Sequence, residues 1–169
     1  MSGVLRAFAE WYLERTDPAT GERKPEPKPP TEPVRDCNHT VLAIDDDPIF
    51  LRTVTTVLRK RGFSVLAATN GAKGLNLLCY APGNIEVVLL DYGMPHLNGA
   101  ETLGHLRKLN PKIKVIALTA VDITRLPKSF HEGVDKFIQK PFDARKVIDA
   151  ILSLVEPGAQ PATLKAGKN

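Results

Sequence analysis

The stretch "LLDYGMPHLNG", residues 89–99, decides the fold of this chain. An apolar run ends in a single carboxylate, Asp91, and a loop of Gly, Pro and Asn follows it. Such a run predicts a buried strand, and the loop residues predict a sharp turn after it. A carboxylate that ends a buried strand either caps the turn or belongs to a reactive site. The choice depends on what the rest of the chain brings to the same place.

Apolar runs and helical patterns alternate from residue 39 to about residue 156. Strands that are apolar throughout are buried on both faces, and their alternation with helices predicts a parallel sheet with right-handed crossovers. The fold class is therefore a doubly wound α/β sandwich with a five-stranded sheet. The predicted strands are 40–45, 64–68, 86–91, 114–119 and 136–140, and the predicted helices are 48–62, 71–80, 100–109, 127–132 and 144–155.

Three segments lie outside this α/β pattern. Residues 1–15 place apolar side chains along one helical face, which predicts a short amphipathic helix. Residues 16–38 hold six prolines and predict an extended linker. Residues 157–169 are too short and polar to fold and predict a flexible tail. The amphipathic helix would pack on its own domain, on a second copy in a homodimer, or on a separate partner.

Composition excludes several classes of protein. The net charge is only +4, and no long block of Lys and Arg suggests direct binding to nucleic acid. No apolar stretch reaches the roughly 18 residues needed to insert into a membrane. The two cysteines, Cys37 and Cys79, have no metal-binding spacing. These features predict a cytoplasmic protein without zinc or disulfides.

Polar residues follow four of the five predicted strands. Parallel sheets bind ligands outside the carboxyl ends of their strands, so these residues should meet at one edge. Each has another interpretation when taken alone, because an aspartate can cap a helix, a threonine can be a core residue and a lysine can be solvated. Together they predict a site, and its candidates are Asp45, Asp46 and Asp47, then Asp91, Thr119 and Lys140.

The segments that carry these residues resemble the receiver domain of two-component response regulators. They are "VLAIDDDP" (41–48), "LLDYGMPHLNGAE" (89–101), "IALTA" (116–120) and "FIQKPF" (137–142). The resemblance covers residues 39–156 and implies a flavodoxin-like (βα)5 fold. It also implies signalling through a histidine kinase or phosphotransfer protein and a downstream target protein.

The resemblance implies a role for each candidate. Asp91 would be the phosphoacceptor, and Lys140 and Thr119 would bind phosphoryl oxygens. A carboxylate repels an incoming phosphoryl group, so such a site needs compensating positive charge. Mg²⁺ or Mn²⁺ would supply it, because these cations prefer oxygen ligands. The implied ligands are Asp45, largely through bound water, Asp46, Asp91 and the main-chain carbonyl of Gly93, while Asp47 would not contact the cation.

The resemblance also implies a conformational switch made of Thr119 and Phe137, and a cis peptide bond between Lys140 and Pro141. Phe137 lacks the hydroxyl of a tyrosine, so burial would define its two states. Pro127 restricts the next helix to a start near that residue, which alters the face through which relatives usually contact their targets.

Two departures from the family concern the lifetime of the phosphoryl group. Gly93 and Val121 stand where relatives often carry polar side chains that position water. Neither residue can do this with its side chain, which predicts slow loss of phosphate.

Two other functional classes stay open at this stage. A phosphatase of the haloacid dehalogenase type needs a second aspartate two residues after the first, and position 93 is glycine. A receiver-like binding scaffold would keep the fold without phosphorylation. The favoured function is a signalling receiver that catalyses only its own phosphorylation and dephosphorylation.

Overall fold

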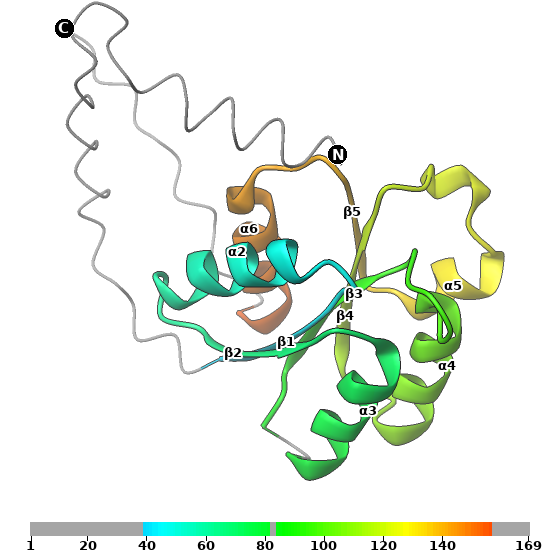
Figure 1. Ribbon diagram of the computed structural model, residues 1–169, viewed down its shortest axis with the longest axis horizontal. Helices are drawn as coiled ribbons and strands as arrows, with labels where there is room; N and C mark the ends of the chain where they lie inside the picture. Colours follow the sequence, from blue (N-terminus) through cyan, green and yellow to red (C-terminus); the bar gives the residue numbers. More distant parts are fainter. Residues whose placement is uncertain (1–38, 82–83, 157–169) are drawn as a thin grey trace, which may run out of the picture. The chain divides into compact units, whose positions relative to one another are not determined.

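The structure is a computed structural model that describes residues 39–81 and 84–156. Five parallel strands form one sheet in the order β2-β1-β3-β4-β5 (Figure 1). The predicted strands are confirmed to within one residue at each end. They are β1 (Thr40–Ile44), β2 (Ser64–Ala68), β3 (Val87–Asp91), β4 (Lys114–Thr119) and β5 (Lys136–Gln139). The predictions for residues 1–15, 16–38 and 157–169 lie outside the described residues.

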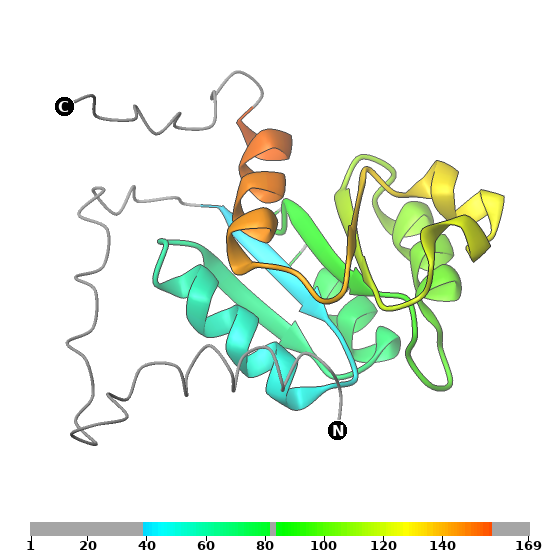
Figure 2. The ribbon, with the colours of Figure 1, turned by 90° about the horizontal axis from the view of Figure 1, so that it is seen from above.

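Helices cover both faces of the sheet. They are α2 (Pro48–Arg59), α3 (Gly71–Tyr80), α4 (Gly99–Leu109), α5 (Lys128–Gly133) and α6 (Ala144–Val155). Figures 1 and 2 show α2 and α6 on one face and α3, α4 and α5 on the other. None of the helices in 39–81 and 84–156 is long and apolar enough to cross a membrane.

Side chains alternate between these two layers along each strand. In β1, Val41 and Ala43 belong to the core beneath α2 and α6, and Leu42 and Ile44 belong to the core beneath α3, α4 and α5. All four are at most 1% exposed. Burial on both faces explains why the strands read as continuous apolar runs.

The first helix begins where it was predicted and ends earlier. Asp47 caps α2, because its carboxylate accepts hydrogen bonds from the N–H groups of Ile49 and Phe50. The prediction of a helix to residue 62 was wrong, since α2 ends at Arg59. The chain then turns, and Gly62 takes a φ of 88°, which favours glycine.

A close backbone approach fixes the loop after Asp91. A Cβ atom at Gly99 would lie 2.5 Å from the main-chain oxygen of Asp91 and 2.6 Å from the Cα of Tyr92. Only glycine fits there without a shift. Asn98 and Glu101 form a reciprocal capping box at the start of α4. The loop therefore returns tightly against the end of β3.

The segment before α5 differs from a regular helix, as Pro127 predicts. Pro127 is the N-cap residue of α5, which is only six residues long. A 3-10 turn, η1 (Ile123–Arg125), precedes it and was not predicted. Asp122 stabilises this turn by accepting hydrogen bonds from the N–H and the hydroxyl of Thr124.

Candidate functional site

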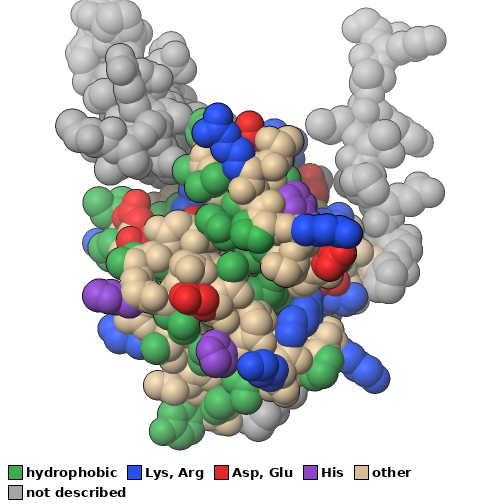
Figure 3. Space-filling view, turned by 90° about the vertical axis from the view of Figure 1, so that its right-hand side faces the viewer, with side chains coloured by type: hydrophobic (Ala, Val, Ile, Leu, Met, Phe, Trp, Pro, Cys, Tyr) green, Lys and Arg blue, Asp and Glu red, His purple; other side chains and the backbone are tan. Residues whose placement is uncertain are grey.

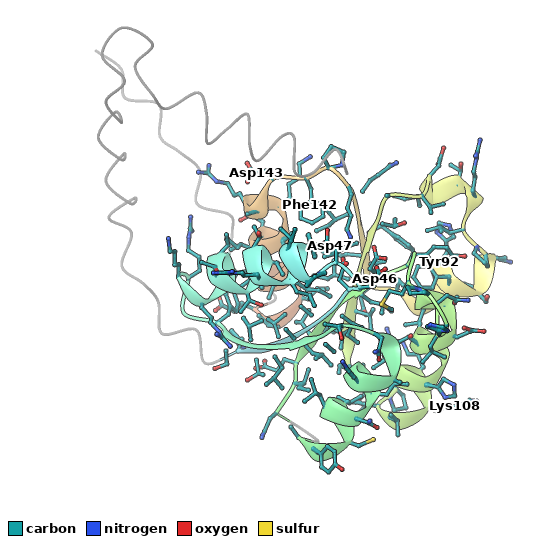
Figure 4. All side chains as sticks on the ribbon, viewed as in Figure 1. Asp46, Asp47, Tyr92, Lys108, Phe142 and Asp143 are labelled. Atoms are coloured by element: carbon teal, nitrogen blue, oxygen red, sulfur yellow. The ribbon has the colours of Figure 1, made fainter. Side chains whose placement is uncertain are left out.

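The strand ends bring the predicted site residues to one edge of the sheet. Ile44 of β1 pairs with Leu90 of β3, so Asp45 and Asp91 follow at the same level. Thr119 of β4 pairs with Gln139 of β5, which places Lys140 directly beyond it. Figure 4 shows Asp46 and Asp47 where β1 ends and α2 begins. The edge predicted from the sequence is therefore assembled.

Lys140 joins two carboxylates. Its Nζ lies 2.6 Å from Oδ2 of Asp45 and 3.0 Å from Oδ1 of Asp91. The three side chains are 13%, 3% and 9% exposed, so the ion pairs are shielded from water. Burial acts to lower the pKa of Lys140, but the hydrogen bond to Asp45 and the charge of Asp91 outweigh it, and the pKa is raised. The peptide bond between Lys140 and Pro141 is cis, as the resemblance implied.

The negative charge of Asp45 is less well compensated than the positive charge of Lys140. Its carboxylate accepts hydrogen bonds from Lys140 and from the backbone N–H of Asp47. Burial nevertheless raises its pKa, and the nearby charge of Asp91 acts in the same direction. An additional cation at this place would relieve that cost, because it would favour the ionised carboxylate.

Three carboxylates form a group that fits a hard divalent cation. Asp45, Asp46 and Asp91 each offer an oxygen, and these oxygens lie within 4.8 Å of one another. Asp46 is exposed, so the group is open to solvent on one side. An all-oxygen donor set of this kind suits Mg²⁺ or Mn²⁺. Asp47 does not belong to this group, and its carboxylate caps α2.

Both oxygens of the Asp91 carboxylate have a donor. Lys140 holds Oδ1, and the backbone N–H of Gly93 donates to Oδ2 at 2.8 Å. These two contacts fix the orientation of the carboxylate at the end of β3.

The sequence pattern of the family described as response regulator receiver domain matches residues 41–152. The chain belongs to the response regulator receiver family.

Relatives agree with this assignment. The chain is 36% identical to the transcriptional regulatory protein CpxR homolog of Haemophilus influenzae over 124 residues. This match covers 72% of this chain and 52% of that protein. The chain thus spans about half the length of this curated relative.

Solved structures show the same fold. A response regulator receiver domain protein from Clostridium thermocellum has a TM-score of 0.66 at 29% identity, over 70% of this chain and 95% of that one. The response regulator protein TrrA from Thermotoga maritima, solved with Mg(2+)-BeF, has a TM-score of 0.61 at 28% identity, over 69% of this chain and 98% of that one. TrrA has also been solved in complex with the histidine kinase ThkA.

Thr119 of this receiver is a completely buried hydroxyl at the end of β4. Its Oγ1 accepts a hydrogen bond from the backbone N–H of Val121 at 3.0 Å. That bond uses a lone pair of the hydroxyl and leaves its hydrogen for donation to another group. Val121 itself is 36% exposed beside the site.

Phe137 is part of an aromatic cluster in the receiver. Its ring centroid lies 6.0 Å from that of Phe130 and 4.9 Å from that of His131. Phe130 continues the cluster to Tyr92, at 5.0 Å, the residue after Asp91. Nε2 of His131 lies 2.8 Å from the carbonyl oxygen of Ile123 and must donate to it, which ties α5 to η1. Phe137 is only half-buried at this point.

The receiver surface over α4 and α5 is mixed in character. Figure 3 views this side, where Lys and Arg side chains are interspersed with hydrophobic side chains and a few acidic ones.

Sequence reasoning missed the aromatic surroundings of Lys140. Nζ lies 4.4 Å from the ring centroid of Phe50, which the sequence placed only on the apolar face of a helix. The spacing of apolar residues in α2 contains no signal for this contact, because its partner, Lys140, directly follows β5.

Proposed function

We propose that this receiver accepts a phosphoryl group on Asp91 from a histidine kinase or phosphotransfer protein. It then signals through contacts with a downstream target protein. The observation that carries the proposal is the Lys140 ammonium between the carboxylates of Asp45 and Asp91. Family membership supports it, and so does the binding of Mg(2+)-BeF and of a histidine kinase by TrrA.

Asp91 acts as the nucleophile in this proposal. One of its carboxylate oxygens forms a bond to phosphorus while the nitrogen–phosphorus bond of the donor histidine breaks, and the electron pair leaves with the imidazole. The contacts from Lys140 and Gly93 hold the carboxylate in one orientation for this attack. Lys140 then exchanges a carboxylate contact for a phosphoryl oxygen, and the Thr119 hydroxyl donates to a second oxygen.

Three carboxylates and one carbonyl would hold Mg²⁺ or Mn²⁺. The proposed ligands are Asp45, through bound water, Asp46, Asp91 and the main-chain oxygen of Gly93. The cation, when bound, neutralises charge on the carboxylates and on the phosphoryl oxygens. The side chains of Gly93 and Val121 cannot orient water, so we expect the phosphoryl group to be lost slowly.

Labelling with a small phosphodonor tests the proposal. The protein is incubated with acetyl phosphate and Mg²⁺, and its intact mass is measured. We expect a gain of one phosphoryl group in the wild type and none in Asp91→Asn. Asp149→Asn is a matched control, because Asp149 is an exposed aspartate of α6 away from the site. Phosphate retained by Asp91→Asn would contradict the assignment of the acceptor.

The cation is tested separately by titration. Asp46→Asn should weaken Mg²⁺ binding at least as much as the roughly 10- to 100-fold typical of residues that only support metal ligands. Asp149→Asn should leave the affinity unchanged. Equal affinities in Asp46→Asn and the wild type would remove Asp46 from the ligand set.

A further inference from the structure

Lys140 has a third partner besides its two carboxylates. Its Nζ lies over the ring of Phe50, 4.4 Å from the centroid. Phe50 comes from the first turn of α2 and is 8% exposed, within the core that α2 and α6 share with the sheet. The ammonium is therefore enclosed by an aromatic face as well as by Asp45 and Asp91.

Two contacts fix the position of the Phe50 ring. The backbone N–H of Phe50 donates to the Asp47 carboxylate at 3.2 Å, which anchors the residue at the start of α2. The ring of Phe142 meets that of Phe50 edge to face, with centroids 5.9 Å apart and planes at 90°. Figure 4 shows Phe142 and Asp47 on the side of the molecule where α2 begins. The ring is thus held before any ligand arrives.

An aromatic face holds an ammonium differently from a carboxylate. Each carboxylate oxygen takes one N–H of the three that lysine has. The ring attracts the whole charge through its quadrupole and requires no particular N–H. The ammonium can therefore give up a carboxylate and bind a new acceptor while it stays on the ring.

We propose that Phe50 is a positioning residue for phosphoryl transfer. Its ring holds the Lys140 ammonium in position while the ammonium exchanges a carboxylate oxygen for a phosphoryl oxygen. The inference rests on the proposed function, because the exchange needs a phosphoryl group at Asp91. A cation on the carboxylates weakens their attraction for Lys140 and leaves the ring contact unchanged, so Phe50 matters most during the reaction itself.

The first test changes the electron density of the Phe50 ring while keeping its volume nearly constant. Phenylalanine analogues with one and then three ring fluorines are introduced at position 50, because fluorine withdraws electron density from the face. The rate of labelling by acetyl phosphate should fall with each step. Phe50→Leu should lower it by roughly 5- to 30-fold, the range expected for loss of a desolvated cation–π contact. Labelling of the fluorinated series at one common rate would overturn the inference, even where Phe50→Leu fails to fold.

A double-mutant cycle separates positioning from general packing. In a Lys140→Ala background, Phe50→Leu should cause no further loss of labelling rate, because its effect passes through Lys140. Losses that multiply in the double variant would show that Phe50 acts elsewhere, and would overturn the inference.

A spectroscopic readout is independent of the reaction. Protons of the Lys140 ε-methylene near the ring face should show an upfield NMR shift in the wild type with Mg²⁺, and Phe50→Leu should lose it. Absence of this upfield shift in the wild type would show that Lys140 does not lie on the Phe50 ring, and would overturn the inference. A wild type that is never labelled would instead overturn the proposed function, whereas equal labelling of wild type and Phe50→Leu overturns only the role of Phe50.

Discussion

Two clusters of ion pairs at opposite ends of the sheet differ in the charge that they leave unbalanced. At the carboxyl ends of the strands, the candidate site holds three carboxylates, and one ammonium, that of Lys140, pairs with two of them, Asp45 and Asp91. At the amino ends of β4 and β5, the single carboxylate of Asp135 meets both Arg107 and Lys114. The first cluster lacks positive charge, and the second does not.

The Asp135 cluster is complete without any ligand. Arg107 and the backbone N–H of Val115 each donate to Oδ2 of Asp135 at 2.9 Å, and Lys114 lies 3.3 Å from Oδ1. Burial acts to raise the pKa of Asp135, but these donors outweigh it and the pKa is lowered. Arg107 also binds the main-chain oxygens of Pro111, Ile113 and Gly133.

The difference separates a structural cluster from a functional one. Around Asp135 every contact lowers the cost of ionisation, so groups of the protein itself compensate the charge of this carboxylate. Around Asp45 burial raises the pKa although Lys140 is in contact, so Lys140 alone does not offset the cost of burying that carboxylate.

The largest effect is expected from removing the single positive charge of the site. Lys140→Met leaves two buried carboxylates unpaired and should lower the free energy of unfolding by about 3–5 kcal/mol. Mg²⁺ should restore much of this loss, because it replaces the missing charge. Arg107→Met, at a side chain that is 27% exposed, should lose roughly 1.5–3 kcal/mol from its charged hydrogen bonds.

Denaturant unfolding of both variants, with and without Mg²⁺, makes the measurement. Recovery in Arg107→Met as large as that in Lys140→Met would break the distinction between the two clusters.

An intermediate effect, with a defined pH dependence, is expected at Asp135. A carboxyl group whose pKa is lowered by folding stabilises the protein above its unfolded pKa of about 3.9, and this stability is lost as the pH falls through the folded value. Asp135→Asn should cost roughly 1.5–3 kcal/mol at pH 7. The difference from the wild type should shrink at pH values below about 4. Unfolding curves across this range, with Asp149→Asn as control, would refute the idea if the difference stayed constant.

The smallest effect is expected from an ion pair in water. Lys128 and Glu132 of α5 lie 3.7 Å apart, with side chains 90% and 67% exposed. Lys128→Ala should change the free energy of unfolding by less than about 0.5 kcal/mol. A cost comparable to that of Asp135→Asn would mean that burial is not what distinguishes these pairs.

The sequence predicted the helices and strands that have a regular spacing of apolar residues and a clear terminus. Strand termini follow from apolar runs, and parallel topology places those termini together, so Asp45, Asp91 and Lys140 could be assigned to one edge. The contact between Arg107 and Asp135 could not, because it depends on how α4 is rotated against the sheet and on side-chain direction. The ring of Phe50 beneath Lys140 was missed for the same reason.

Partners distant in sequence were missed as well. No partner for His39 could be identified from the sequence. Its Nδ1 lies 2.8 Å from Glu86, 47 residues away, where β1 and β3 start side by side. The contact between His39 and Glu86 depends on which strands are neighbours in the sheet, and no local sequence pattern predicts strand order.

That strand order also puts the strand before Lys140 at the edge of the sheet. β1 pairs with β2 and β3, β4 pairs with β3, and β5 pairs with β4 at the edge. Chains emerge from the ribosome from the N-terminus onward, so Asp45 and Asp91 are available before Lys140 exists. Without Lys140 these two carboxylates have no ammonium between them, and their charges repel each other. Docking of β5 brings the ammonium that offsets this repulsion in part, which couples completion of the sheet to assembly of the site.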